Sequence, residues 1–273
     1  SIPFLGDLPF DKQKEESDIM LTDGNKHEQF NEALRIVREN LNFMLPGTDG
    51  CGKVIQMISL RPDSGKTFIT INLSTSMSMT GKRVVAIDLD LRKASLTRRL
   101  RISSKQNGIS HYLSGNVMGV DTLIQTINIP SCSFDVIPSG ILPPNPAELL
   151  KSKKLEELIA ILKQQYDYIL FDNPPFGLVV DAFICSRLAD QPIYVIRSGM
   201  FDKRLLPDLW DLHESGKLKH MGILLNAVDY KRMAYDYKYS YGYSYHYHYG
   251  EPHKRESWLK RFNKKIFNRH LYK

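Results

Sequence analysis

Two features that would assign a chain to a broad class are scarce in this sequence: long apolar runs and cysteines. No apolar run reaches the roughly 18 residues that a membrane-spanning helix needs, so we do not expect this chain to cross a membrane by itself. The three cysteines, Cys51, Cys132 and Cys185, lie far apart without metal-ligand spacing, which predicts reduced core thiols in a cytosolic setting. The sequence begins at Ser1 with neither a methionine nor a signal-peptide pattern, which suggests a processed or excised piece.

Basic charge is concentrated at one end of the chain. The formal net charge is +7. Residues 250–273 hold eight Lys and Arg against two Glu, a local charge of +6, so the rest of the chain is nearly neutral. A chain that binds nucleic acid usually carries a basic domain rather than a basic tail. This distribution therefore predicts no nucleic-acid partner.

The basic end also has an apolar side. A basic amphipathic helix is typical of a segment that lies on a membrane surface or binds a partner. Each Lys or Arg near an anionic leaflet contributes about 1 kcal/mol. The alternative is a solvated tail that only keeps the protein soluble. The apolar residues are Trp258, Leu259, Phe262, Ile266 and Leu271, and the basic residues around them are Lys260, Arg261, Lys264, Lys265 and Arg269.

Between residues 27 and 229, apolar runs of strand length alternate with amphipathic segments. Continuous apolar strands that alternate with helices predict an α/β fold with a mostly parallel central sheet, flanked by helices on both faces. With 273 residues and 42% hydrophobic content, the chain can bury a large core. The expected strands are 54–60, 83–90, 134–140, 166–172, 192–199 and 221–228. A helix is expected at 27–45, and the segments 146–165 and 202–216 are expected to be mainly helical.

The loop after the first expected strand ends in Gly65-Lys66-Thr67, which is the end of a P-loop pattern. In a P-loop, backbone N–H groups face the phosphates, the lysine neutralises their charge and the hydroxyl reaches Mg²⁺. The match is imperfect, because Leu60 stands where the pattern has its first glycine. By itself, the tripeptide also fits an ordinary helix start. The residues expected to bind the nucleotide are Arg61, Pro62, Asp63, Ser64, Gly65, Lys66, Thr67 and Phe68.

Three aspartates stand at the ends of two further expected strands. "VVAIDLDLRK" ends in Asp88-x-Asp90, and "YILFDNPPF" ends in Asp172 followed by two prolines. In an open parallel sheet, ligands bind outside the carboxyl ends of the strands, so these carboxylates should lie beside the P-loop. Three carboxylates next to a polyphosphate would repel it unless Mg²⁺ is present. The pattern therefore predicts a site for Mg²⁺ and a nucleotide.

The combination of P-loop, Asp-x-Asp strand end and Asp-x-Pro-Pro strand end resembles the bacterial tyrosine kinases. These are the cytoplasmic kinase domains of polysaccharide co-polymerases. The resemblance covers roughly residues 1–249 and implies a P-loop NTPase fold of the deviant Walker type, similar to MinD and ParA. Other segments that look like the family are "PFLGDLP", "NEALRIVRENLNFML", "NGISHYLSG", "VIPSGILPPNPAELL" and "MGILLNAVD".

The resemblance implies an enzyme that binds ATP and Mg²⁺ and transfers the γ-phosphate to tyrosines near its own C-terminus. Lys66 would contact the phosphates, and Thr67 and Asp90 would hold the metal or its water shell. Asp172 would supply the Walker B coordination. Asp88 would take a base-like role toward the phenol. Because a carboxylate has a pKa of about 4 and a phenol of about 10, Asp88 would orient the phenol and accept its proton late.

The first expected helix, residues 27–45, has one apolar stripe and one charged side. Glu32, Arg35 and Arg38 follow one side of this helix, away from the apolar stripe. Such a side is usually just solvated. The resemblance implies instead that these three residues pack protomers into a ring. Arg61 falls where related ATPases have a second lysine that reaches across a dimer, and a solvated loop arginine is the alternative.

Every second residue from 235 to 249 is a tyrosine. A two-residue period is typical of a half-buried strand, but fifteen residues are long for a strand and the preceding sheet already looks complete. A metal site at His246 and His248 lacks further ligands. The resemblance implies that these tyrosines are the phosphate acceptors. The expected acceptors are Tyr235, Tyr237, Tyr239, Tyr241, Tyr243, Tyr245, Tyr247 and Tyr249.

The expected organisation has four parts: a juxtamembrane-type linker (1–26), a kinase domain (27–229), a flexible tyrosine cluster (230–249) and the basic tail (250–273). The resemblance implies the cytoplasmic domain of an inner-membrane protein, with a tyrosine phosphatase and the polysaccharide polymerisation and export machinery as partners. Two other functions stay open. One is an ATPase switch of the MinD and ParA kind, and the other is a weakly active scaffold phosphorylated by another kinase.

Overall fold

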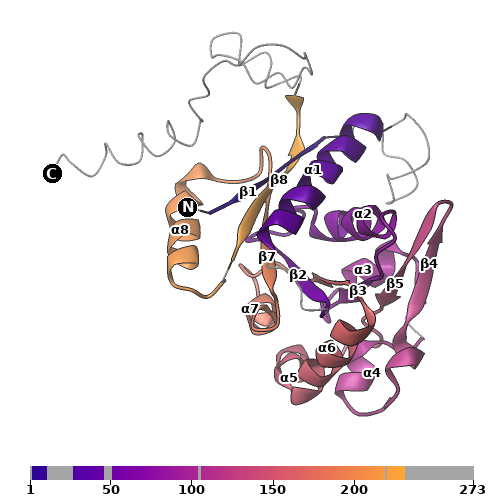
Figure 1. Ribbon diagram of the computed structural model, residues 1–273. Helices are drawn as coiled ribbons and strands as arrows, with labels where there is room; N and C mark the ends of the chain where they lie inside the picture. Colours follow the sequence, from indigo (N-terminus) through magenta and orange to yellow (C-terminus); the bar gives the residue numbers. More distant parts are fainter. Residues whose placement is uncertain (1, 11–26, 46–50, 104–105, 219, 231–273) are drawn as a thin grey trace, which may run out of the picture. The chain divides into compact units, whose positions relative to one another are not determined.

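The computed structural model describes residues 2–10, 27–45, 51–103, 106–218 and 220–230. Within these residues, eight strands form one sheet in the order β1-β8-β7-β2-β6-β3-β5-β4 (Figure 1). The strands are β1 (Phe4–Pro9), β2 (Lys53–Ile58), β3 (Val84–Asp88), β4 (Gln125–Ile129), β5 (Cys132–Ile137), β6 (Tyr168–Asp172), β7 (Gln191–Arg197) and β8 (Gly222–Val228). The six strands predicted from the apolar runs are confirmed, each within a few residues of its expected bounds.

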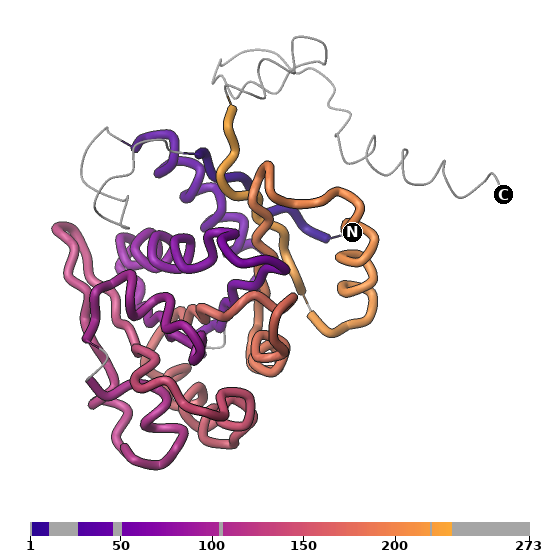
Figure 2. Tube along the Cα trace, turned by 180° about the vertical axis from the view of Figure 1, so that it is seen from behind, coloured from indigo at the N-terminus to yellow at the C-terminus, as the bar shows by residue number. Residues whose placement is uncertain are grey.

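Helices cover both faces of this sheet, as the alternating pattern predicts. They are α1 (Glu28–Met44), α2 (Lys66–Ser78), α3 (Ser95–Arg99), α4 (Ile109–Leu113), α5 (Pro146–Lys151), α6 (Lys153–Gln165), α7 (Asp181–Ser186) and α8 (Leu206–Glu214), with short 3-10 turns η2 (Val120–Leu123) and η3 (Lys203–Leu205). In the reverse view, α8 and the hairpin of β4 and β5 lie at opposite ends of the sheet (Figure 2). The helix expected at 27–45 is confirmed as α1.

The central strand β6 shows why both faces are covered. Its residues alternate between two apolar clusters, since successive side chains of a strand point to opposite faces. Leu170 packs in the cluster that contains Leu34 of α1, while Ile169 and Phe171 pack in the cluster that contains Leu158 of α6. A strand buried on both faces needs a continuous apolar run, and "YILFD" provides one.

Parallel pairing aligns the ends of the three strands that carry the predicted site. Asp88 at the end of β3 lies opposite Asp172 at the end of β6, and Asp172 also lies opposite Met57 of β2. The P-loop follows β2 directly. All three predicted motifs therefore meet at the carboxyl edge of the sheet. β4 pairs antiparallel with β5 and was not predicted.

One local expectation is wrong, while the segments 146–165 and 202–216 are mainly helical, as predicted, but each is divided into two pieces. The loop expected over residues 1–26 contains β1, whose Leu5 and Leu8 are buried and which pairs parallel with β8. The segment 146–165 breaks at Ser152, which is extended (φ −64°, ψ 149°) and whose hydroxyl donates to the Leu149 carbonyl at 2.7 Å. In the span 202–216, the 3-10 turn η3 leads directly into α8, which begins at Leu206.

Some predictions fall outside the described residues, namely the linker residues 11–26, the tyrosine cluster at 235–249 and the basic end at 250–273. Among the described helices, none has the length and apolar character needed to cross a bilayer. All three cysteines are free thiols, as predicted, but Cys51 is exposed and Cys132 is partly exposed, so only Cys185 is a core thiol.

Candidate active site

The P-loop leads from β2 into α2 with two residues in the left-handed region, Asp63 (φ 56°) and Gly65 (φ 93°). The N–H of Ile69 makes the first hydrogen bond of the helix, to the Gly65 carbonyl at 2.9 Å. The N–H groups ahead of Ile69 are those that a helix start leaves without intrahelical partners. N–H groups arranged in this way, at a helix N-terminus, favour an anion such as phosphate.

Residues from the ends of β7 and β8 hold the P-loop in this conformation. The Asn226 side chain donates from Nδ2 to the Ser64 carbonyl at 2.9 Å, and the Arg197 guanidinium donates to the Asp63 carbonyl at 3.1 Å. Neither Asn226 nor Arg197 was singled out from the sequence. The available signal was a polar residue near the carboxyl end of an apolar strand, the same signal that identified the aspartates.

The loop after β6 bonds to the backbone at Ser59 and Leu60, where the P-loop pattern has its first glycine. The N–H of Phe176 donates to the Ser59 carbonyl at 3.0 Å, and the N–H of Gly177 donates to the Leu60 carbonyl at 3.2 Å. The Leu60 side chain packs into an apolar cluster beside Phe176. A β-carbon on Gly177 would lie 2.4 Å from the Leu60 oxygen. The loop after β6 therefore supports the P-loop where the usual glycine is absent.

Lys66 is buried at the start of α2, and its ammonium donates to the Ser59 hydroxyl at 2.9 Å. Burial lowers the pKa of this ammonium, and the carboxylates of Asp172 and Asp90 oppose the effect. These carboxylates thus help a buried cation to stay charged. Lys66 thus supplies a buried positive charge at the start of α2, and its contact with phosphates stays a prediction.

Thr67 and Asp172 are in direct contact. The Thr67 hydroxyl donates to Asp172 Oδ2 at 2.8 Å. Burial raises the pKa of the Asp172 carboxyl to about 6, although the bond from Thr67 opposes this. A hydroxyl at the helix start beside a carboxylate at a strand end is the oxygen pair expected to hold Mg²⁺.

Asp88 is fully buried and occupied by hydrogen bonds within the chain. Its Oδ2 accepts from the N–H and the hydroxyl of Thr97, at 2.8 and 2.6 Å, and its Oδ1 accepts from the N–H of Asp90 at 3.2 Å. Burial, together with the charge of Asp172, raises the pKa of Asp88 to about 8. The base-like role of Asp88 stays a prediction. In the structure, the bonds from Thr97 to Asp88 hold α3 against the end of β3.

Asp90 turns toward the loop that follows β3. Its carboxylate accepts from the Ser95 hydroxyl at 2.8 Å and from the N–H of Lys93 at 3.1 Å. In the part of the chain that the structure describes, no three His, Cys, Asp or Glu side chains converge closely enough to hold a metal ion by themselves. Mg²⁺ usually keeps several waters and binds one or two carboxylates plus phosphate oxygens, so this site does not need such a trio.

These donors fit a nucleotide with Mg²⁺. The loop presents backbone N–H groups and a buried ammonium to phosphates, while Thr67, Asp90 and Asp172 offer oxygens to a hard cation. Burial raises the pKa values of Asp88 and Asp172, and the charge of Lys66 offsets this only in part at Asp172, so further positive charge would stabilise this carboxyl cluster. When bound, Mg²⁺ would supply that charge and neutralise the phosphates.

Four residues at the two ends of the predicted nucleotide-binding segment lie in two different environments. Arg61, Pro62 and Asp63 are exposed on the loop. The Phe68 ring instead packs on Phe30 of α1, with ring centroids 5.5 Å apart. Phe68 can therefore serve the site only through its backbone.

The expected oligomer contact divides into two parts. Glu32 and Arg35 form an exposed pair at 3.4 Å, and their side chains are 54% and 60% exposed. The Arg38 side chain is only 16% exposed and donates to the Ser76 carbonyl of α2 at 2.9 Å. Glu32 and Arg35 thus offer an open surface, whereas Arg38 joins α1 to α2 within the chain. The ring contact itself stays a prediction.

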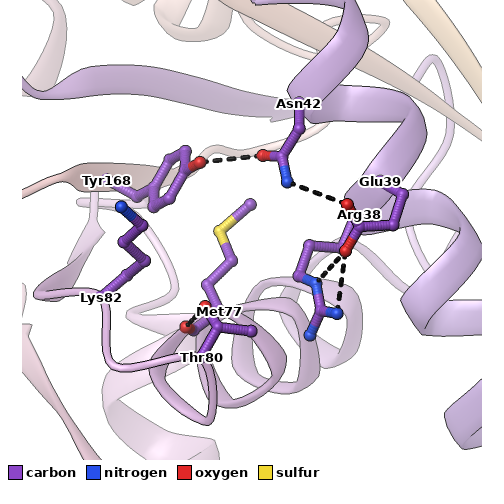
Figure 3. A pocket seen from close by; sticks show the side chains of 7 residues that line it. All are labelled: Arg38, Glu39, Asn42, Met77, Thr80, Lys82 and Tyr168. Carbon is purple, nitrogen blue, oxygen red and sulfur yellow. Dashed lines mark hydrogen bonds and ion pairs between the residues drawn. The ribbon is translucent and has the colours of Figure 1, made fainter.

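Arg38 also lines a cavity of about 210 Å³ between α1, the end of α2 and the start of β6 (Figure 3). The Tyr168 hydroxyl donates to Asn42 Oδ1 at 2.8 Å across this cavity, and the Lys82 ammonium points toward the Tyr168 ring. Tyr168 begins β6, and Asp172 ends it. This cavity therefore lies at the amino edge of the sheet, away from the P-loop.

Comparison with known proteins agrees with the geometry of the site. The family model described as an AAA domain matches residues 52–211. The tyrosine-protein kinase CpsD of Streptococcus agalactiae is 31% identical over 218 residues, which are 80% of this chain and 90% of CpsD. The tyrosine-protein kinase wzc of Salmonella typhimurium is 32% identical over 80% of this chain, which spans 31% of the length of wzc.

Solved structures give the same assignment. The kinase domain of the Escherichia coli tyrosine kinase ETK superposes with a TM-score of 0.71 at 26% identity, covering 90% of this chain and 95% of that domain. The septum site-determining protein MinD of Pyrococcus horikoshii, solved with Mg-ADP, has a TM-score of 0.52 at 26% identity over 63% of this chain and 68% of MinD. The fold is thus that of a P-loop NTPase, and MinD is a structural neighbour solved with Mg-ADP. With its P-loop, its strand-end carboxylates and its likeness to CpsD over most of both chains, this chain belongs to the bacterial tyrosine-protein kinases.

Proposed function

We propose that this kinase uses ATP and Mg²⁺ to phosphorylate the tyrosine cluster at residues 235–249 of another copy of the chain. One observation carries the proposal: Lys66, Thr67 and Asp172 meet at the carboxyl edge of the sheet in a chain that has eight alternating tyrosines. In such a transfer, positioning and charge neutralisation lower most of the barrier. Lys66 then orients the phosphates, while Thr67, Asp90 and Asp172 hold the cation.

The length of chain after β8 supports transfer between copies. β8 ends at Val228 on the same edge as the P-loop, because β7 and β8 are parallel to β2. An extended chain covers about 3.3 Å per residue, so residues 229–249 reach on the order of 65 Å. That reach is enough to enter the active site of a neighbour. The exposed Glu32 and Arg35 supply a surface through which neighbours can pack into a ring.

Mass spectrometry of the intact protein tests this function. After incubation with ATP and Mg²⁺, the chain should show a ladder of phosphate additions, each about 80 Da. A variant with all eight cluster tyrosines replaced by phenylalanine should show none, because the acceptor hydroxyls are gone. Additions of the same number on the phenylalanine variant would place the acceptors elsewhere and overturn the proposal.

The second candidate is a nucleotide-dependent switch without kinase activity, which the likeness to MinD favours. Such a protein would consume ATP in the same experiment while its own mass stayed unchanged. That outcome would leave the alternating tyrosines without a role in catalysis.

Phosphorylation should also loosen the assembly. Each phosphotyrosine adds a charge of roughly −1.5 to −2. Alternate residues of an extended chain lie about 6.6 Å apart, within the Debye length of about 8 Å at physiological salt. A phosphorylated cluster would repel itself and the buried carboxylates, so it should leave a neighbour's site. Replacing the cluster tyrosines by glutamate should lower the assembly mass measured by light scattering. An unchanged mass would contradict the release model.

We further propose that the kinase acts at the cytoplasmic side of an inner membrane, in polysaccharide polymerisation and export, with a tyrosine phosphatase that resets it. Residues 256–273 would add a contact with anionic lipid through their basic amphipathic pattern. Removing residues 251–273 should therefore reduce pelleting with anionic liposomes. Equal pelleting of the full and shortened chains would remove the lipid contact.

A further inference from the structure

Arg92, two residues after Asp90 in the segment "VVAIDLDLRK", has a partner that the sequence did not indicate. The Arg92 guanidinium donates to both oxygens of Asp181, from Nε at 2.8 Å and from an Nη at 3.1 Å. The Asp181 side chain is completely buried at the start of α7, whereas that of Arg92 is 41% exposed. A buried carboxylate with a two-point arginine partner is a strong, directional link. It ties the loop after β3 to the segment after β6.

A second link reaches the same segment from the centre of the sheet. Gln56 of β2 is fully buried, and its amide donates from Nε2 to Asn173 Oδ1 at 3.0 Å and to the Ala182 carbonyl at 2.7 Å. Asn173 follows Asp172 directly, and Ala182 follows Asp181 directly. These two bonds satisfy both N–H groups of the Gln56 amide, which would otherwise cost free energy in the middle of an apolar strand. Among the described residues, Gln56 Oε1 and Asn173 Nδ2 are buried without a hydrogen-bond partner.

Together the two links connect Asp90 and Asp172, the two aspartates expected at Mg²⁺. On one side, Arg92, two residues after Asp90, bonds to the start of α7. On the other side, Gln56 bonds both to the start of α7 and to Asn173, the residue after Asp172. The loop between β6 and α7 also carries the N–H groups of Phe176 and Gly177, which donate to the carbonyls of Ser59 and Leu60. A shift at the start of α7 would thus move the loops around both aspartates and the P-loop.

We propose that Arg92 and Asp181 are positioning residues that set the Mg²⁺ affinity of the active site by holding these three loops in register. The inference rests on the proposed site for Mg²⁺ and ATP. Groups that orient metal ligands without touching the metal typically change metal affinity 10- to 100-fold when they are replaced. Neither Arg92 nor Asp181 needs to touch the nucleotide for this effect.

The test is the Mg²⁺ dependence of nucleotide binding, which needs no turnover. Binding of fluorescently labelled ADP would be followed while Mg²⁺ is titrated, for the full chain and for Arg92→Ala, Arg92→Lys, Asp181→Asn and the double variant Arg92→Ala/Asp181→Asn. Each alanine or asparagine variant should need about 10-fold more Mg²⁺ for half-saturation. The double variant should need no more than the worse single variant, since both remove one link. Arg92→Lys keeps the positive charge but loses the two-point contact of the guanidinium, so its Mg²⁺ midpoint should lie between those of the unaltered chain and Arg92→Ala.

A matched control separates positioning from general stability. Arg83 pairs with Asp167 at 3.3 Å at the amino edge of the sheet, so Arg83→Ala removes an arginine ion pair outside the site. It should leave the Mg²⁺ midpoint unchanged. If the variants at Arg92 and Asp181 lower the melting temperature without moving the Mg²⁺ midpoint, the role is merely structural and the inference is overturned.

Three other outcomes would also decide the role of the Arg92 and Asp181 pair. If Arg92→Ala weakens ADP binding equally with and without Mg²⁺ while Asp181→Asn does not, Arg92 touches the nucleotide itself and the inference is overturned. If the unaltered chain binds ADP without any Mg²⁺ dependence, the proposed Mg²⁺ site falls, and the inference falls with it. If the unaltered chain binds ADP in a Mg²⁺-dependent way and the variants have the same Mg²⁺ midpoint, the inference about Arg92 and Asp181 is overturned while the proposed Mg²⁺ site stands.

Discussion

Replacing Lys66 by methionine should reduce the rate of tyrosine phosphorylation by a factor on the order of 10³. The Lys66 ammonium lies beside the loop N–H groups and bonds to Ser59 at 2.9 Å, so its charge is already in place where the phosphates are expected. Because burial lowers the pKa of this ammonium, the charged group costs folding free energy. Methionine has a similar length and no charge, but it also removes a positive charge that stabilises the Asp172 carboxylate, so the two effects oppose each other and the melting temperature should change little. The measurements are the rate of phosphotyrosine formation and a thermal melt.

The same variant can report whether transfer occurs between copies. Its tyrosine cluster is intact, so Lys66→Met should gain phosphate when a small amount of the active chain is added. Lys153→Met removes an exposed lysine at the start of α6 and should leave the rate unchanged. A Lys66→Met protein that phosphorylates itself at the normal rate would refute the phosphate-binding role. A variant that active chain cannot modify would refute transfer between copies.

Replacing Gly65 by alanine should abolish nucleotide binding and destabilise the fold. A β-carbon on Gly65 would lie 2.1 Å from Asn226 Nδ2, and the residue has φ +93°, which alanine rarely adopts. Asn226 would have to move, and it would then lose its bond to the Ser64 carbonyl. The loop N–H groups would no longer be held toward the phosphates. Binding of labelled ADP and unfolding in urea would measure the two effects.

Gly81 is a matched control, because it has φ +78° with nothing within 4 Å of the β-carbon position. Gly81→Ala therefore carries only the backbone cost of the left-handed region, about 1–2 kcal/mol. Gly65→Ala should cost clearly more, and it alone should lose ADP binding. Equal losses of stability, with ADP binding kept in both variants, would mean that the contact with Asn226 does not position the loop.

The strands and motifs of the site were predictable because their signals are local. An apolar run such as "YILFD" identifies a strand buried on both faces, and a polar residue at its end marks the carboxyl edge. Since parallel strands end at one edge, Asp88, Asp172 and the P-loop had to meet there. β1 was missed because a short edge strand with Gly6 and Pro9 resembles a loop. Ser152 was missed because the break in its helix involves neither glycine nor proline.

The sequence by itself determined the α/β class, the strand ends that form the site and the family resemblance, because each depends on residues close together in the chain. Only the tertiary structure revealed which side chains secure the site. Asn226 bonds to a carbonyl 162 positions earlier, and Arg92 bonds to an acid 89 positions later. No local period carries such pairings, since they depend on which loops the completed sheet brings to one edge. The same reason explains Arg38, whose helical spacing suggested an exposed contact but whose guanidinium bonds to α2 once α1 has packed.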